Sequence, residues 1–344
     1  MKIDVICNDG SPIGVTLRDL YGEGNRGIGV GGAEYALLTL CEEWHKAGNE
    51  VILYNNPTLN GSPFEQRNLD RFNPLAERDA LITFRSPNSR SMGARGLKVW
   101  WSCDQATVGD FAGFAGLVDK IVCISPRHAQ YFSQNYGINN TIVIDIPVRI
   151  QDFDEMGQVE RIPNRLIFTS VPARGLDNLF HIYPTIQSAI PDVSLAITSD
   201  YRLWGVPPSN EHFVAQWTAR SNVIYFGAIP RRQYINELMK SQITIYPCNY
   251  DELFCVSIAE SQYAGSYPIT SGCGALSTTN MGTVLNLDAN NRGNYGAFAN
   301  EVIQMLNNSA LLEEARKEVI KKAKERFNPS RILDEWENKV FNRG

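Results

Sequence analysis

The sequence of 344 residues lacks any long hydrophobic run. A membrane-spanning helix needs about 20 consecutive apolar residues, and no segment approaches that length. The stretch 1–7 is too short for a secretory signal peptide and has the composition of a first strand. We therefore expect a soluble, cytoplasmic protein without a transmembrane segment, and peripheral contact with a membrane stays open.

Cysteine pairs, clustered histidines and an excess of positive charge are missing as well. The seven cysteines are scattered and odd in number, and no two form a Cys-x-x-Cys pair, which argues against a zinc site or a disulfide framework. The four histidines are far apart in the sequence, so no metal site is expected. The net charge is −5, from 32 basic and 37 acidic residues, and it gives no reason to expect nucleic acid as a partner.

What the sequence does contain is a regular alternation of short apolar runs with helical patterns. The strands are expected at 2–7, 50–54, 79–84, 97–101, 119–124 and 141–146, then at 165–170, 193–198, 222–226, 242–247 and 267–270. Many of these runs are apolar throughout, as in strands that helices cover on both faces. The expected helices 32–47, 126–136 and 255–264 are each followed by a glycine. The pattern predicts an α/β fold with parallel sheets.

Two domains are expected, because 344 residues exceed what one compact core usually serves. The break is placed at 147–163, which contains two prolines and a charged stretch that is poor in apolar residues. Residues 1–150 would form the amino-terminal domain, 151–163 a linker and 164–325 the second domain. The stretch 309–342 has an amphipathic helical pattern, and its end, 326–344, has the option of packing back toward the first domain. Ligands bind such sheets at the carboxyl ends of their strands, so we expect a cleft between the domains.

The segment 250–260, Tyr-Asp-Glu-Leu-Phe-Cys-Val-Ser-Ile-Ala-Glu, is the most specific motif. A strand runs into a short loop, and a helix is expected to begin near Phe254 or Cys255. An offset of eight residues spans about 12 Å along a helix, so Glu252 and Glu260 would face one site from different depths. The amides of a helix start lie between them and offer a seat for a diphosphate. The alternative is that Glu252 only caps the helix and that Glu260 is an exposed helical residue.

The sequence that follows this motif resembles glycosyltransferase family 4. A helix, then Gly265, then Pro268 in the next strand and the loop 274–276 (Gly-Ala-Leu) are in the register of that family. The resemblance covers most of the second half of the chain. It implies two Rossmann-like domains in the GT-B arrangement, and a transfer that retains the anomeric configuration of the donor sugar.

The resemblance also implies roles for residues of the motif. Glu252 would contact the hydroxyls of the donor sugar, and Glu260 would hold the ribose hydroxyls. The distal phosphate would be contacted in the loop formed by Leu253, Phe254, Cys255 and Val256.

Arg174 stands at a corner where a strand ends and a helix opens. It matches the lysine that the family usually has just before a glycine, whereas Thr169 or Ser170 stands where the family has an arginine. A guanidinium at this corner can neutralise a departing diphosphate, so Arg174 and Glu252 are the catalytic candidates.

The stretch 223–230, with Gly227, resembles the family's strand and loop around the nucleobase, whose backbone groups would contact the base. Asp200 and Tyr201 follow another strand and are further candidates for that pocket. Arg231 and Arg232 begin the next helix, where arginines are usually exposed.

A glycine-rich segment in the first half allows two interpretations. Gly27, Gly29 and Gly32 have the spacing of a dinucleotide-binding loop, which would suggest an NAD-dependent dehydrogenase. However, about 20 residues separate them from the first strand, and the second strand ends in 54–56 (Tyr-Asn-Asn) without an acidic residue for the adenosine ribose. The run Gly31-Gly32-Ala33-Glu34 instead resembles the loop by which family 4 enzymes approach donor phosphates and acceptor. The preceding loop, around 9–12, would either close over the site or be a plain surface loop.

Three residues are candidates for the acceptor side. Asp104 follows the strand 97–101, where relatives often carry His-Asp, and Cys103 replaces that histidine. Arg85 and Asn88 follow the strand 79–84. Ser125 opens a helix and is expected to be an N-cap rather than a catalyst.

Together, the residues and the resemblance predict a retaining, metal-independent glycosyltransferase. It would move a hexose from a UDP- or GDP-sugar to a saccharide, lipid or protein acceptor, and it would need no cofactor besides this co-substrate. Catalysis would consist mainly of stabilising the charge that grows on the diphosphate. The alternatives are a nucleotide-sugar epimerase of the same fold and a non-catalytic carbohydrate-binding relative.

Overall fold

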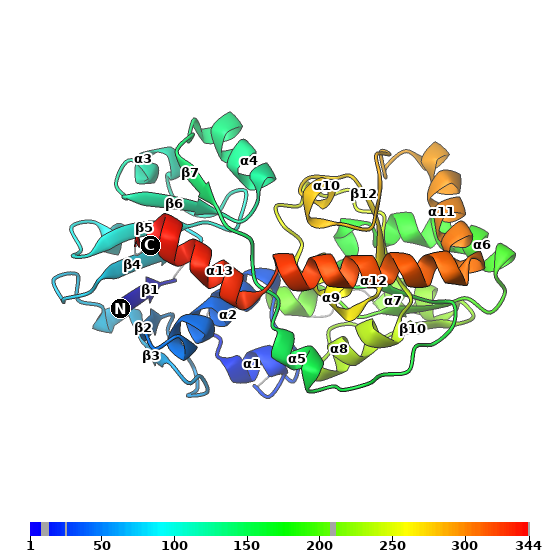
Figure 1. Cartoon of the computed structure of the whole chain (residues 1–344), viewed down its shortest axis with the longest axis horizontal. Helices are drawn as coiled ribbons and strands as arrows, with labels where there is room; N and C mark the ends of the chain where they lie inside the picture. Colours follow the sequence, from blue (N-terminus) through cyan, green and yellow to red (C-terminus); the bar gives the residue numbers. More distant parts are fainter. Residues whose placement is uncertain (8–13, 25, 207–210, 343–344) are drawn as a thin grey trace. The chain divides into compact units, whose positions relative to one another are not determined.

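The computed structural model describes residues 1–7, 14–24, 26–206 and 211–342 (Figure 1). The loop around 9–12, which we considered as a lid, lies outside these residues. The chain divides into two compact units. Unit 1 comprises Met1–Arg26, Val30–Pro147 and Phe327–Gly344, and unit 2 comprises Gly27–Gly29 and Val148–Arg326.

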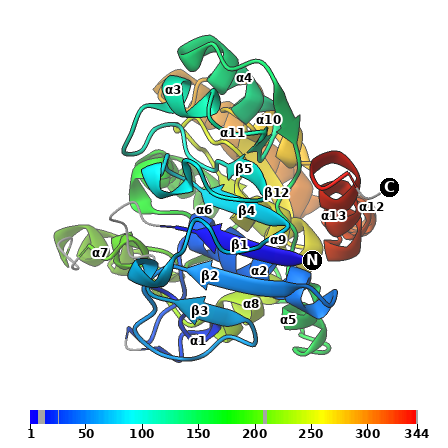
Figure 2. The same cartoon turned by 90° about the vertical axis from the view of Figure 1, so that its left-hand side faces the viewer.

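Unit 1 is built on a sheet in which seven described strands run parallel in the order β3-β2-β1-β4-β5-β6-β7 (Figure 2). The strands are β1 (Lys2–Ile6), β2 (Glu50–Tyr54), β3 (Glu65–Arg67), β4 (Ala80–Phe84), β5 (Leu97–Trp101), β6 (Lys120–Cys123) and β7 (Thr141–Val143). The helices are α1 (Leu17–Tyr21), α2 (Gly32–Lys46), α3 (Phe111–Ala115), α4 (Pro126–Tyr136) and α13 (Pro329–Glu335), which a π-helical turn (Trp336–Val340) extends. Because all these strands run parallel, their carboxyl ends lie along the same edge of the sheet, where α/β proteins bind ligands.

The end of the chain packs into unit 1 through tryptophans. Trp336 meets Trp44 of α2 edge-on, with ring centroids 5.1 Å apart, and Trp101 of β5, with centroids 5.7 Å apart. All three rings are fully buried. The expectation of one helical stretch over 309–342 is wrong at 327–328. A helix ends where proline follows, because Pro329 cannot continue it, and Asn328 caps the new helix by accepting a hydrogen bond from the amide of Ser330.

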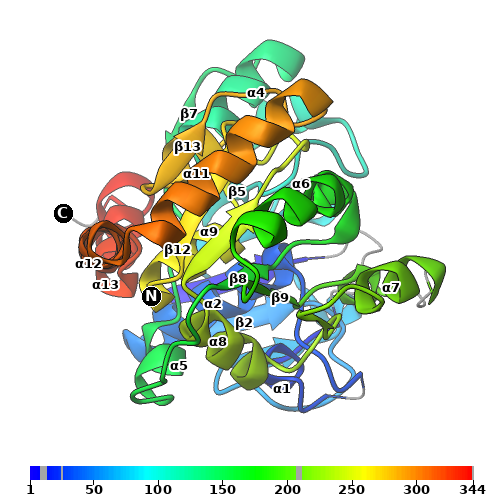
Figure 3. The same cartoon turned by 90° about the vertical axis from the view of Figure 1, so that its right-hand side faces the viewer.

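Unit 2 has six described strands, all parallel, in the order β10-β9-β8-β11-β12-β13 (Figure 3). The strands are β8 (Arg165–Phe168), β9 (Ser194–Ile197), β10 (Val223–Tyr225), β11 (Ile243–Tyr246), β12 (Tyr267–Ser271) and β13 (Thr283–Leu285). The helices are α5 (Ile150–Asp154), α6 (Leu176–Ala189), α7 (Glu211–Thr218), α8 (Arg231–Lys240), α9 (Val256–Ala264), α10 (Leu276–Thr279), α11 (Tyr295–Asn307) and α12 (Ser309–Arg326). Helices α6 and α11 pack against each other, and α9 packs against α8 and α12.

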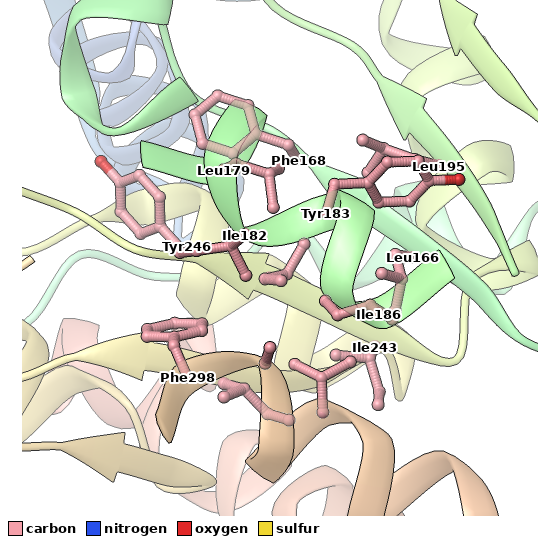
Figure 4. Close-up of a cluster of buried hydrophobic side chains, with 14 of the residues drawn as sticks. Leu166, Phe168, Leu179, Ile182, Tyr183, Ile186, Leu195, Ile243, Tyr246 and Phe298 are labelled. Carbon is pink, nitrogen blue, oxygen red and sulfur yellow. The ribbon is translucent and has the colours of Figure 1, made fainter. Parts of the chain in front are cut away.

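The core of unit 2 shows why its apolar runs form strands. Leu166 and Phe168 of β8 and Ile243 of β11 contribute side chains to one cluster with α6 and with Phe298 of α11 (Figure 4). These strand residues are 0 % exposed. The absence of a polar alternation in such strands therefore reflects their burial by helices.

The helix ends follow the glycines that the sequence offers. Gly137 and Gly265 adopt left-handed conformations directly after α4 and α9, as expected of glycine C-caps. Helix α2 ends at Lys46, and Gly48 is left-handed two residues later. No described helix is long and apolar enough to cross a membrane.

Candidate functional site

The loop between β11 and α9 carries Glu252. Helix α9 begins at Val256, directly after Cys255, which agrees with the expected start near Phe254 or Cys255 to within two residues. Glu252 lies in the loop before the helix. Cys255 occupies the N-cap position in a left-handed conformation, with φ 72°, and no side chain caps the helix. The first amides of a helix have no acceptor within the helix, which leaves this end suited to an anion.

Glu252 is buried, with 4 % exposure, and forms an ion pair with Arg174. Arg174 Nη1 lies 3.1 Å from Glu252 Oε1 and 3.3 Å from Oε2. The hydroxyl of Tyr246, at the end of β11, donates a hydrogen bond of 2.6 Å to the same Oε1. The alternative that Glu252 only caps the helix is therefore wrong, since its carboxylate is engaged by Arg174 and Tyr246.

Arg174 is held at this place by charge and by aromatic rings. Burial opposes the charge of its guanidinium, but Glu252 together with Tyr246, Tyr250 and Cys255 outweighs burial and raises the pKa of Arg174. Its Cζ lies 4.1 Å from the ring centroid of Tyr250 and 5.6 Å from that of Trp204, as in cation–π contacts. Arg174 Nε is buried, and the described residues offer it no hydrogen-bond partner. A buried donor of this kind is suited to a ligand oxygen.

Two glycines allow the loops of Arg174 and Glu252 to approach other backbone closely. Gly274 has φ 59°, and a Cβ there would collide with the backbone nitrogen and oxygen of Glu252. The amide of Ala275 donates a 2.6 Å hydrogen bond to the carbonyl of Glu252. Gly175 has φ 112°, and a Cβ there would collide with the carbonyl of Pro247. The glycines next to the site therefore set the position of Glu252 and Arg174.

Glu260 lies on α9 and is also buried, with 3 % exposure. Arg231 Nη2 donates a 2.6 Å hydrogen bond to Glu260 Oε1, and Arg231 Nε donates to Asp152. The expectations that Arg231 is exposed and that Glu260 could be an exposed helical residue are wrong. Two carboxylates face Arg231, and buried charges persist only when they are paired.

The burial of Arg231 has a signal in the sequence of α8 that our prediction missed. Arg231, Ile235 and Leu238 are buried on α8 at positions i, i+4 and i+7, which is the spacing of one helix face. An arginine on an apolar stripe needs a buried acidic partner.

In the loop that follows β10, several backbone groups already form hydrogen bonds with other residues of unit 2. The amides of Phe226 and Gly227 donate to the carbonyl of Ile197. The amide of Ala228 donates to Asp200 Oδ2 at 2.9 Å, and its carbonyl accepts from Arg202 at 3.1 Å. Both polar backbone groups of Ala228 are thus engaged.

Asp200, a candidate for the base pocket, holds this loop in place through hydrogen bonds that it accepts from Ala228 and Arg202. Burial alone would raise the pKa of its carboxyl, but Arg202 and the backbone amides of Ala228 and Arg202 outweigh burial and lower it. Gly227 has φ 66°, and a Cβ there would collide with this carboxylate.

In unit 1, the structure brings two of the three acceptor-side candidates together. Arg85, which has φ 69°, forms ion pairs with Asp104 and, at 3.5 Å, with Glu34 of α2. The side chain of Asn88 instead accepts a hydrogen bond from the amide of Arg90 and caps a short turn. Gly31 and Gly32 are the N-cap and the first residue of α2.

A surface hollow of about 390 Å³ is lined in part by Arg90, which belongs to the turn that Asn88 caps. It is lined by Asn56, Asn68, Leu69, Asp70 and Arg90. These residues follow the carboxyl ends of β2, β3 and β4, where α/β sheets bind ligands. Two amides, a carboxylate and a guanidinium offer both donors and acceptors to a polar molecule.

Ser125 is the N-cap of α4, as predicted, because its Oγ accepts a hydrogen bond from the amide of His128. His128 is buried, and burial lowers its pKa to about 3. Within the described part of the chain, no group of three or more His, Cys, Asp and Glu side chains is arranged to hold a metal ion.

Solved structures share this architecture over the whole chain. Sucrose-phosphate synthase from Thermosynechococcus elongatus superimposes with a TM-score of 0.71 at 16% identity, covering 100% of both chains. HepE from Anabaena, in complex with UDP, gives a TM-score of 0.70 at 14% identity, covering 99% of this chain and 100% of its own. The chain has the GT-B fold.

This GT-B chain also matches part of a longer protein. TarM of S. aureus gives a TM-score of 0.59 at 14% identity, and the match covers 77% of this chain but 56% of TarM. No protein-family model matches the sequence, and no curated protein is significantly similar to it. At these identities, the likeness to solved structures establishes the GT-B fold.

Proposed function

We propose that this GT-B protein is a glycosyltransferase of family 4 type, which transfers a sugar from a nucleoside diphosphate donor with retention of configuration. The observation that carries the proposal is the ion pair between the partly exposed Arg174 and the buried Glu252, which precedes the uncapped start of α9. HepE, which shares the fold, is described in complexes with UDP and with UDP-glucose.

The diphosphate of the donor would lie between Arg174 and the start of α9. Arg174 Nε is a buried donor, and the first amides of α9 add the positive end of a helix. As the bond between the anomeric carbon and the phosphate oxygen breaks, negative charge grows on the diphosphate. Donors that are already in place stabilise that charge without reorganising. Arg174 and the helix start would thus supply the positive charge that the leaving group needs.

Glu252 would bind the sugar ring of the donor. An ionised carboxylate has about four lone-pair sites, and Arg174 and Tyr246 leave room for sugar hydroxyls. Retention follows if the acceptor oxygen attacks the anomeric carbon on the face from which the phosphate leaves. In that step the acceptor hydroxyl gives its proton to the departing phosphate oxygen, so the protein needs no nucleophile of its own.

The acceptor would bind to unit 1, where Arg85 and Asp104 form an ion pair. The acceptor classes to be tested are saccharides, lipids and proteins. Gly31 and Gly32 would let the backbone at the start of α2 approach the substrates closely.

The experiment has two stages. A panel of UDP-, GDP- and ADP-sugars is first screened for thermal stabilisation, because a ligand that binds the native state raises the melting temperature. The bound donor is then incubated with and without candidate acceptors. Release of the nucleoside diphosphate only with an acceptor supports transfer, whereas a change of the sugar without acceptor identifies an epimerase. Binding without either reaction would indicate a non-catalytic relative.

Arg174→Met and Arg220→Met form a matched pair for this test. Both arginines are in unit 2 and stack on aromatic rings, and Arg220 Cζ lies 3.7 Å from the ring centroid of Phe180. Loss of a charged hydrogen bond predicts donor affinity about 10- to 100-fold lower for Arg174→Met. Arg220→Met should bind the donor normally. Equal donor affinity in the two variants would refute the proposed diphosphate site.

A further inference from the structure

A row of four charged side chains with alternating sign is buried in unit 2. The row runs from Glu260 of α9 to Arg231 of α8, then to Asp152 of α5 and to Arg149, which precedes α5. Their exposures are 3 %, 6 %, 7 % and 1 %. Arg231 Nη2 lies 2.6 Å from Glu260 Oε1, Arg231 Nε is hydrogen-bonded to Asp152 Oδ2, and Arg149 Nε lies 3.4 Å from that same oxygen.

The stability of the folded protein does not by itself explain why four charged side chains are buried here. Removing charges from water is costly, and apolar side chains of similar volume often give equal or higher stability. The row is also formed across large distances in sequence, since Asp152 and Arg231 are 79 positions apart. Directional hydrogen bonds and ion pairs can fix the orientation of one charged side chain, which an apolar cluster could not do.

Glu260 is the member that can serve a ligand. It lies on α9, the helix whose start forms the proposed diphosphate site. Arg231 occupies one of its carboxylate oxygens, and Tyr234 of α8 interacts with it as well; burial first, and then Glu260, raise the pKa of that tyrosine. The carboxylate keeps further lone pairs for two hydroxyl donors.

We propose that Arg231 and Asp152 are positioning residues, which hold the Glu260 carboxylate ionised and oriented so that the site selects ribonucleoside diphosphates over their 2′-deoxy counterparts. The inference rests on the proposed function and on the role that the resemblance to family 4 implies for Glu260, which is to hold the ribose hydroxyls of the donor. Two neighbouring hydroxyls, on C2′ and C3′, would donate to one fixed carboxylate. A 2′-deoxyribose leaves part of a buried, charged acceptor unsatisfied, which is costly. Sugars activated by deoxythymidine diphosphate would therefore be poor donors.

The experiment measures dissociation constants for UDP and 2′-deoxy-UDP by calorimetry, with GDP and 2′-deoxy-GDP as a second pair. The proteins are the wild type, Glu260→Gln, Arg231→Met and Asp152→Asn. One lost hydrogen bond to a charged group predicts a wild-type preference for ribose of about 10- to 100-fold. We expect this preference to fall to about threefold or less in Glu260→Gln and Arg231→Met, and to an intermediate value in Asp152→Asn.

Arg165→Met is the matched control. Arg165 is 7 % exposed and forms a buried ion pair with Glu237, which lies on α8 like Arg231. This variant loses a buried ion pair to the same helix without touching Glu260. We expect a lowered melting temperature and an unchanged preference for ribose.

The possible outcomes separate the inference from the proposed function. If Arg231→Met or Asp152→Asn weakens both nucleotides equally and keeps the preference, or if Arg165→Met abolishes it too, the positioning role is refuted. If the wild type binds nucleotides without a preference for ribose, Glu260 does not hold the ribose, and the inference fails while diphosphate binding stands. If neither these four nucleotides nor the ADP-sugars of the donor panel bind, the proposed function itself is overturned. Asp152→Asn, which preserves side-chain volume, keeps the test valid should Arg231→Met fail to fold.

Discussion

At the scale of single residues, the two glutamates of the motif are distinguished by their partners. Glu252 is paired with Arg174 and accepts from Tyr246, and Glu260 is paired with Arg231. The sequence indicated both glutamates and Arg174, because Glu252 and Glu260 belong to one local motif and Arg174 follows a strand end. Tyr246 and Arg231 were not predicted as their partners, since those contacts depend on how β11 and α8 pack.

Tyr246→Phe tests the hydroxyl that supports Glu252. Burial raises the pKa of Tyr246, and so does the carboxylate of Glu252, so the hydroxyl remains a donor throughout the neutral range. Its loss leaves a buried carboxylate with one partner fewer, and we expect turnover to fall about tenfold. Initial rates at saturating donor measure this effect. Tyr183→Phe is the control, because the hydroxyl of Tyr183 donates to the carbonyl of Val193 in the same unit. Equal rates for the two variants would contradict the role of Tyr246.

His128 predicts a dependence of stability on pH. Burial lowers its pKa to about 3 in the native state, whereas the ordinary value is about 6.5. Above pH 6.5 neither state binds the proton. Between pH 6.5 and 3 only the unfolded state binds it, so the contribution of His128 to stability is lost as the pH falls. The loss is at most about 1.4 kcal/mol per pH unit.

Unfolding by urea at pH 7, 6 and 5 measures this loss. Wild type should lose more stability on acidification than His128→Asn, which has no titrating group there. His181→Asn, at an exposed position, should behave like the wild type. A constant difference in stability between wild type and His128→Asn over this range would show that the imidazole is not excluded from protonation.

At the scale of elements, the apolar runs predicted all the central strands, and two edge strands were missed. Strand β3 has the sequence Glu-Gln-Arg, and β13 has only three residues. An edge strand has one neighbour and is partly exposed, so it needs no apolar run. The start of α9 was predicted to within two residues, but the left-handed conformation of Cys255 at its N-cap has no marker in the sequence.

Gly274→Ala tests whether the glycine loop positions Glu252. The new Cβ would collide with the backbone of Glu252, and alanine is strained at φ 59°. We expect donor affinity to drop at least tenfold, measured by calorimetry, together with a lower melting temperature. Gly296→Ala is the control, because a Cβ there meets no atom within 4 Å and the residue lies in α11. Alanine at this second position of the helix should leave donor affinity and the melting temperature close to those of the wild type. Normal donor binding by Gly274→Ala would mean that Glu252 does not depend on the loop.

At the scale of the whole molecule, each unit has a parallel sheet and a core of its own. The alternation of strands and helices predicted parallel sheets, because apolar runs and helical patterns can be read from the sequence alone. For the end of the chain, the sequence offered packing toward the first domain only as an option. Phe327–Gly344 belongs to unit 1 although it follows unit 2 in the chain, and only the aromatic contacts of Trp336 show why.

A pair of tryptophan substitutions tests whether the two cores are energetically separate. Trp336 is fully buried in unit 1 against Trp44 and Trp101, and Trp217 is fully buried in unit 2 against Phe180. Truncating a buried tryptophan to alanine costs about 3–5 kcal/mol. Hydrogen exchange of peptides from both units, followed by mass spectrometry, locates the loss of protection. Trp336→Ala should raise exchange in α2 and β5 and leave α6 and β8 protected, and Trp217→Ala should do the reverse. If either variant raises exchange in both units alike, the chain unfolds as one cooperative block, and the two cores cannot be treated as independent.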